Sequence, residues 1–86
     1  MPTTTKRKKH NMCEDIVDLI VGDVLVWDNT GGKDDCTVSG CTPGLEHDSY
    51  TIFAGKTLDA NVVQKCDRTY KCKCGKLEND PKLIVN

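Results

Sequence analysis

Six cysteines in a chain of 86 residues constrain the fold more than any other feature of the sequence. An even number of cysteines in so short a chain favours three disulfide bonds over free thiols, and disulfides persist in oxidising, extracellular settings. Each bridge would add about 2 to 4 kcal/mol of stability, mainly by restricting the unfolded chain. The residues expected to be bonded are Cys13, Cys36, Cys41, Cys66, Cys72 and Cys74.

The composition predicts a small hydrophobic core. Apolar residues make up 37% of the chain and aromatic residues only 5%. Burial at roughly 25 cal/mol per Å² then barely offsets the conformational entropy that a chain of this length loses on folding. The sequence therefore predicts a single disulfide-rich domain over residues 12–86, preceded by a disordered basic arm over residues 1–11.

The arm carries the basic run Lys6-Arg7-Lys8-Lys9. Three functions compete for this run: a dibasic processing site at Lys6-Arg7, a short nuclear-import signal, and contact with anionic surfaces. The alternative to all three is a plain solvated tail. The segment from Met1 to Asn11 lacks the apolar run of a secretory signal. We therefore expect a mature secreted form to which Met1 was added.

Charge is distributed unevenly over the predicted domain. Ten acidic residues lie between Cys13 and Asp59 against only Lys33 and Lys56, whereas six basic residues face three acidic ones from Ala60 onward. Such polarity can steer a charged partner. The predicted domain is acidic overall, so no nucleic-acid partner is expected, and no apolar run approaches the length of a membrane span.

The segment after the arm carries a helix signal. Asn11 is followed three residues later by Glu14, as in a capping box, and Gly22 follows the last apolar residue. The apolar residues between them share one helical face, which predicts a short helix over Met12 to Val21. A buried strand is the alternative, because Ile16 to Val21 is rich in β-branched residues.

Short apolar or β-branched runs bounded by Gly, Pro, Asp or Asn predict strands in the rest of the chain. Val24 to Trp27 is apolar on both faces and is expected to be a central strand. The other runs cover residues 37–38, 50–54, 61–65, 69–74 and 83–85. The predicted fold class is α+β, with one N-terminal helix and a mostly antiparallel β-sheet stapled by disulfides.

Cys72 and Cys74 alternate with lysines on one predicted strand. Alternate residues of a strand point the same way, so both cysteines should face inward and should bond to two different partners. Six cysteines allow 15 pairings, and this exclusion leaves 12 of them. The outward residues form a basic hairpin edge that either prevents aggregation or contacts a partner. The candidate binding residues are Arg68, Lys71, Lys73 and Lys76.

Two turn-rich loops are further candidates for a binding epitope. They cover Asp28 to Asp35 and Thr42 to Ser49. Flanking disulfides are expected to hold both loops rigid, and a rigid loop loses less conformational entropy on binding.

A zinc site is the main alternative to disulfides. The four thiolates would be those of Cys36, Cys41, Cys72 and Cys74, with His47 as a substitute ligand. Neither cysteine pair has the Cys-x2-Cys spacing of a zinc knuckle, and two cysteines would be left over. We therefore expect no metal and no cofactor, and an intracellular zinc-stabilised interaction module is the second hypothesis for function.

Motifs for catalysis are missing from the sequence. The two histidines are His10, in the arm, and His47, in a polar stretch. The chain has no nucleophile elbow, no HExxH and no phosphate-binding glycine loop. The protein is therefore not expected to be an enzyme.

The short chain, its six cysteines and its basic arm resemble the small secreted cysteine-rich effectors and toxins of plant-pathogenic fungi. A local similarity to the ToxB-like β-sandwich toxins covers under a third of the chain. It comprises Ser39-Gly40-Cys41-Thr42-Pro43-Gly44, Ile52-Phe53, Gly55 and Cys66. The number of cysteines and the Cys72-x-Cys74 pair depart from the simpler bridging of that family.

The resemblance implies a secreted monomer that binds a host protein, either outside host cells or after translocation into them. A secreted protease or receptor inhibitor is the third hypothesis.

Overall fold

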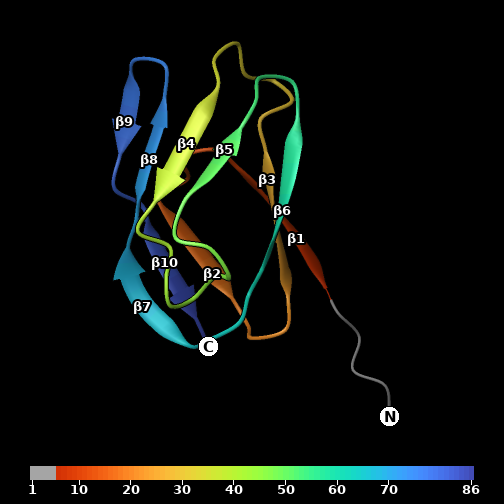
Figure 1. Ribbon diagram of the computed structural model, residues 1–86, viewed down its shortest axis with the longest axis vertical. Helices are drawn as coiled ribbons and strands as arrows, with labels where there is room; N and C mark the ends of the chain where they lie inside the picture. Colours follow the sequence, from red (N-terminus) through yellow and green to blue (C-terminus); the bar gives the residue numbers. More distant parts are fainter. Residues whose placement is uncertain (1–5) are drawn as a thin grey trace.

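The computed structural model describes residues 6–86, and Figure 1 shows their β-strands packed into a sandwich. One hydrogen-bonded sheet has the order β1-β3-β6. Its strands are β1 (Arg7–Asn11), β3 (Val24–Asp28) and β6 (Thr57–Asn61). The described residues contain no helix, so none of them forms a helix that could cross a membrane.

The remaining strands form two sheets that run into one another. The first has the order β2-β10-β7, with β2 (Ile16–Leu19), β10 (Lys82–Val85) and β7 (Cys66–Thr69). The second has the order β5-β4-β8-β9, with β5 (Tyr50–Ile52), β4 (Cys36–Ser39), β8 (Lys71–Cys74) and β9 (Leu77–Asn79). Only Tyr70 separates β7 from β8, so the chain passes directly from one sheet to the other.

The predicted α+β class is wrong, because the segment expected to be a helix forms a turn and strand β2. The capping-box contact does form, since the backbone N–H of Asn11 donates to Glu14 Oε1 at 3.0 Å. It closes a turn instead of starting a helix, and Cys13 within that turn has a φ of 60°. Val17 and Leu19 are buried while Ile16 is exposed, which is the two-residue alternation of a strand.

The domain also starts earlier than the sequence predicted. Residues 1–5 of the expected arm lie outside the described part of the chain, but Arg7–Asn11 is a strand that pairs in parallel with β3. Ion pairs reinforce this pairing: Arg7 with Asp59, Lys8 with Asp23 and Lys9 with Asp28. The basic run thus packs against the acidic part of its own chain.

The strand predictions are mostly confirmed. Val24–Asp28 is a central strand with a neighbour on each side, and the segments predicted around residues 37, 50 and 83 each contain a strand. The strand expected over residues 61–65 is wrong, because β6 ends at Asn61 and only Val62 continues the pairing, through a bridge to Leu45.

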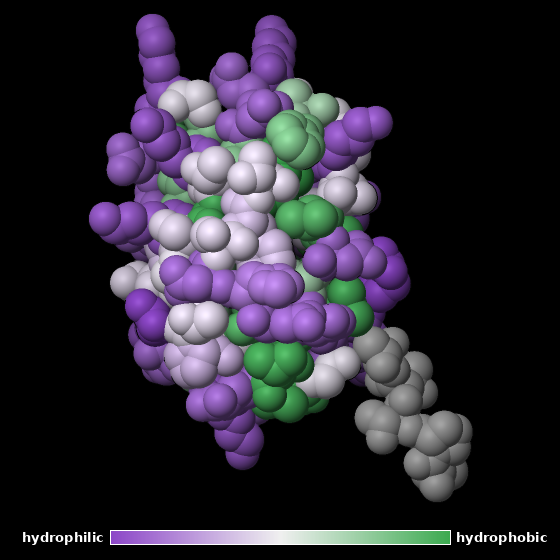
Figure 2. All heavy atoms as spheres, viewed as in Figure 1, coloured by the Kyte–Doolittle hydropathy of each residue, from purple (hydrophilic) through white to green (hydrophobic). Residues whose placement is uncertain are grey.

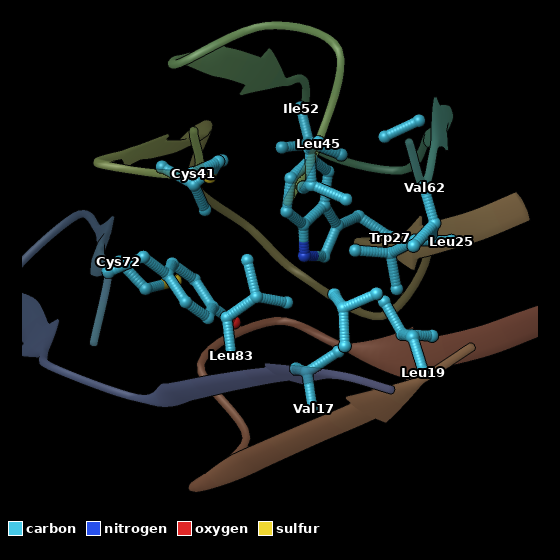
Figure 3. Close-up of a cluster of buried hydrophobic side chains, with 14 of the residues drawn as sticks. Val17, Leu19, Leu25, Trp27, Cys41, Leu45, Ile52, Val62, Cys72 and Leu83 are labelled. Carbon is cyan, nitrogen blue, oxygen red and sulfur yellow. The ribbon is translucent and has the colours of Figure 1, made fainter. Parts of the chain in front are cut away.

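One hydrophobic core fills the sandwich around Trp27. Figure 3 shows the indole of Trp27 between Ile52 and Leu45 on one side and Leu83 and Val17 on the other. The ring of Tyr50 meets the indole edge-on at a centroid distance of 4.8 Å, a favourable aromatic geometry. A chain with one Trp thus builds its core by placing that residue at the centre.

The two ends of the sandwich differ in construction. One end, here called the crosslinked end, comprises the β3–β4 loop (29–35), the β5–β6 loop (53–56) and the β8–β9 turn (75–76). The other, the open end, comprises the β2–β3 turn (20–23), residues 62–65 and Asn86. Figure 1 shows these ends at the top and bottom of the view.

Candidate functional site

Two disulfides meet beside the crosslinked end. Cys36 bonds to Cys74, its direct partner in the β4–β8 register, and Cys13 bonds to Cys72. The bond between Cys13 and Cys72 ties the turn after β1 to β8 across 59 positions of sequence. The expectation that Cys72 and Cys74 bond to different partners is confirmed.

The remaining two cysteines, Cys41 and Cys66, are not bonded, so the structure contains two of the three predicted disulfides. Cys41 is fully buried, and its burial raises the pKa of the thiol to about 12. Burial also raises the pKa of the Cys66 thiol, which is less enclosed and lies under Gly44. Each thiol therefore stays protonated at neutral pH and is a poor nucleophile.

The loop over Asp28 to Asp35 is fixed from inside as well as by the Cys36–Cys74 bond that follows it. Asn29 is buried, and its Nδ2 donates to the carbonyls of Asp34 and Ile52 at 2.9 and 3.0 Å. A Cβ at Gly75 would overlap the Asp34 carboxylate, so the β8–β9 turn presses against the same loop. The loop is therefore held by a buried amide, by the neighbouring turn and by the disulfide that follows it.

The second predicted loop, Thr42 to Ser49, is held without a flanking disulfide. The Thr42 hydroxyl donates to Asp48 Oδ1 at 2.7 Å, and the Thr42 N–H donates to the same oxygen. These bonds, above all the hydroxyl, lower the pKa of Asp48. Leu45 anchors the loop in the core.

The four predicted binding residues do not form a hairpin edge. Lys71 and Lys73 are exposed on β8, which is an inner strand because β9 forms the edge of the sheet. Lys76 lies in the β8–β9 turn. Arg68 contacts the loop over residues 42–49, because its Nη1 donates a hydrogen bond to the carbonyl of Thr42.

Arg68 and Lys71 both line a polar groove of about 440 Å³. Its other charged residues are Asp48 and Asp80. Because two carboxylates face two cations, the groove has mixed charge and is not a basic patch. The sequence reasoning missed this mixture because Asp48 and Asp80 come from distant parts of the chain.

The open end carries a group of exposed aliphatic side chains that the sequence analysis assigned to no site. Ile20, Val21 and Val63 are 55%, 42% and 49% exposed. Backbone bonds bring them together, because the N–H of Gly22 donates to the carbonyl of Val62 at 3.0 Å and that of Val21 donates to Asn86. Figure 2 shows hydrophobic residues gathered at this end of the molecule. We call these three residues the apolar end surface.

Comparison with known proteins identifies a fold and no family. No protein-family model and no curated protein matches the chain. Three solved structures of amicyanin match at 12% identity: an oxidised proline-to-alanine mutant, an oxidised methionine-to-lysine mutant and a Cu(I) methionine-to-alanine mutant. Their TM-scores are 0.60, 0.60 and 0.61, with 95%, 100% and 100% of this chain and 82%, 86% and 86% of theirs covered. The chain therefore has a cupredoxin-like β-sandwich fold.

The residues present do not fit the copper of that fold. A blue-copper site uses two histidines and a cysteine around one ion. His10 is bound to Glu14 at 2.9 Å, and His47 packs its ring against Tyr50. Within residues 6–86, the one group of three or more metal-ligating side chains contains cysteines alone.

Proposed function

We propose that this protein is a secreted, disulfide-stabilised, effector-like binding protein that engages a host protein and performs no catalysis. The observation that carries the proposal is the apolar end surface, three aliphatic side chains exposed together on a small crosslinked domain. Clustered exposed aliphatic residues favour association, because a partner removes them from water at about 25 cal/mol per Å² of apolar area.

The backbone beneath the apolar end surface favours tight binding. Ile20 and Val21 lie on a turn closed by a bond from the N–H of Asp23 to the carbonyl of Ile20, and Val62 is buried next to Val63. A surface that is already ordered loses little conformational entropy when a partner docks. The two disulfides are consistent with an extracellular protein.

The mixed-charge groove with Lys71 supplies a second, polar contact region in this proposal, and the exposed Lys73 lies two residues away on the same strand. Exposed charges of this kind change association rates and their salt dependence more than they change affinity. Electron transfer, which the fold alone would suggest, is not proposed, because the described residues bring no histidine together with a cysteine in a metal-ligating group.

The test compares three variants of the full chain as immobilised bait against host protein extracts. Val63→Asp places a charge in the apolar end surface, whereas Phe53→Asp changes another exposed apolar residue, at the crosslinked end. Lys71→Glu with Lys73→Glu reverses the charge on β8. We expect the wild type and Phe53→Asp to retain a defined protein, Val63→Asp to lose it, and the lysine variant to retain it with altered salt dependence.

Equal retention by all of the variants would contradict the apolar end surface as the contact. A parallel panel of purified proteases distinguishes the inhibitor hypothesis. Stoichiometric inhibition of one protease class by the wild type would replace host-protein binding with protease inhibition.

A further inference from the structure

Four sulfur atoms converge where the two disulfides meet. The Sγ atoms of Cys13, Cys72 and Cys74 all lie within 4.8 Å of one another, and Cys36 is bonded to Cys74. We propose that these four cysteines form a zinc site when the disulfides are reduced, with four thiolates around one Zn²⁺ ion. This inference does not depend on the proposed function.

The spacing of the sulfurs suits zinc. A tetrahedral Zn²⁺ ion with Zn–S distances of about 2.3 Å places its sulfurs about 3.8 Å apart. The Sγ atoms of Cys13 and Cys74, which are not bonded to each other, are 3.7 Å apart. One edge of the tetrahedron therefore exists already, and the other sulfurs can reach their places by side-chain rotation once the disulfides open.

The backbone beneath the sulfurs is fixed by long-range pairing. Cys36 faces Cys74 across the β4–β8 register. Asn79 pairs with Cys72 across β8 and β9, and its Nδ2 donates to the carbonyl of Cys13 at 3.0 Å. The strands and this side-chain bond would hold all four cysteines near their positions after reduction.

The four cysteines lie mostly in the buried interior, and one of them borders a pocket at the surface. Cys13, Cys36 and Cys72 are buried, as ligands of structural zinc commonly are. Cys74 is partly exposed and lines a pocket of about 320 Å³ together with Met12, Asp28 and residues 29–32 of the crosslinked end. A metal ion and a reductant can both reach the cluster through this pocket.

The quartet differs from the one that sequence spacing offered as the alternative to disulfides, because Cys13 takes the place of Cys41. Cys41 lies elsewhere in the core, and neither disulfide includes it.

The disulfide and zinc forms exclude each other because they use the same sulfurs. Reduction by a trialkylphosphine consumes one phosphine and one water for each disulfide, and yields two thiols and one phosphine oxide. Two disulfides thus give four thiols. Binding of one Zn²⁺ ion then displaces four protons from sulfur.

The experiment uses Co²⁺ as a probe on the full chain reduced with the phosphine. Before reduction, thiol titration in denaturant should count two thiols, those of Cys41 and Cys66. After reduction, we expect one equivalent of Co²⁺ to give the visible bands of a tetrahedral ion and a near-ultraviolet sulfur-to-cobalt charge-transfer band. One equivalent of Zn²⁺ should remove both signals.

Variants assign the ligands. Cys13→Ser and Cys74→Ser should each weaken Co²⁺ binding by more than about 100-fold. Cys74→His, which cannot form the disulfide but keeps a zinc ligand, should retain tetrahedral Co²⁺ with a weaker charge-transfer band. The matched control, Cys41→Ser with Cys66→Ser, should keep the full spectrum.

Three results would overturn the proposal. They are a reduced wild type that gives no tetrahedral Co²⁺ spectrum, binding that Cys13→Ser leaves unchanged, and binding that the Cys41→Ser, Cys66→Ser control abolishes. The last result would favour the alternative quartet that contains Cys41. Circular dichroism distinguishes folding from ligation, because metal should restore the β-sheet signal if the reduced chain unfolds.

Discussion

The crosslinked end and the open end of the sandwich are stabilised by different physics. At the crosslinked end, the β3–β4 loop is rich in Gly, Asp and Asn, and two nearby disulfides and the buried amide of Asn29 fix this end. At the open end no disulfide is present, and Leu19 and Val85 are buried beneath backbone hydrogen bonds to Asn86 and Val62. Sulfur thus crosslinks one end of the sandwich, whereas the other end depends on buried aliphatic side chains and backbone hydrogen bonds.

The largest effect is expected from a cavity at the open end. Leu19→Ala removes a fully buried side chain from β2, and we expect the free energy of unfolding to fall by about 2 to 5 kcal/mol. Ile16→Ala changes the same strand on its exposed face and should alter stability by less than about 0.5 kcal/mol. Urea denaturation measures both, and equal losses would show that β2 does not bury the face described above.

The next largest effect is expected from removal of a disulfide beside the crosslinked end. Cys36→Ser with Cys74→Ser removes one disulfide, and we expect a loss of about 2 to 4 kcal/mol. The loss should be accompanied by faster amide hydrogen exchange in residues 29–35, while the open end exchanges as before. A uniform increase in amide exchange rates over the whole chain would contradict the view that this disulfide stabilises the crosslinked end in particular.

A smaller effect is expected from the amide that holds the β3–β4 loop. Asn29→Ala leaves the carbonyls of Asp34 and Ile52 without their donor, and should reduce stability by about 1 to 3 kcal/mol. Gly31→Ala is the control in the same loop, because a Cβ there meets no atom within 4 Å. Thermal denaturation of the two variants should separate them, and matching midpoints would exclude the role given to Asn29.

The smallest effect is the pH dependence of stability that arises from the lowered pKa of Asp28. Its pKa is lowered from 3.8 to about 2, first by the Thr30 hydroxyl, then by the Thr30 N–H and Lys9. A pKa lower in the folded state than in the unfolded state adds stability above pH 4 that is lost as pH falls through 2. Thr30→Ala should move the pKa back toward 3.8, as measured by NMR titration of the carboxyl carbon. An unchanged pKa of Asp28 in this variant would show that Thr30 is not the main cause of the lowered pKa.

The errors of the sequence reasoning have local causes. Asn11 and Glu14 do form the contact of a capping box, but the same contact can close a turn. Arg7–Asn11 has no buried apolar side chain, so no hydrophobic pattern marks it as a strand. It is held by parallel pairing with β3 and by three ion pairs to acidic residues far along the chain. The apolar end surface was missed because Ile20 and Val21 lie on one turn and Val63 comes from a segment far along the chain.

The sequence by itself determined which way the side chains of β8 face. The alternation of Lys71, Cys72, Lys73 and Cys74 places both cysteines inward and both lysines outward, since a strand repeats every two residues. Only the tertiary structure decided which sulfurs meet, and that Cys41 and Cys66 stay unbonded. Disulfide partners depend on the register of strands far apart in the chain, such as β4 with β8, and local spacing carries no information about that register.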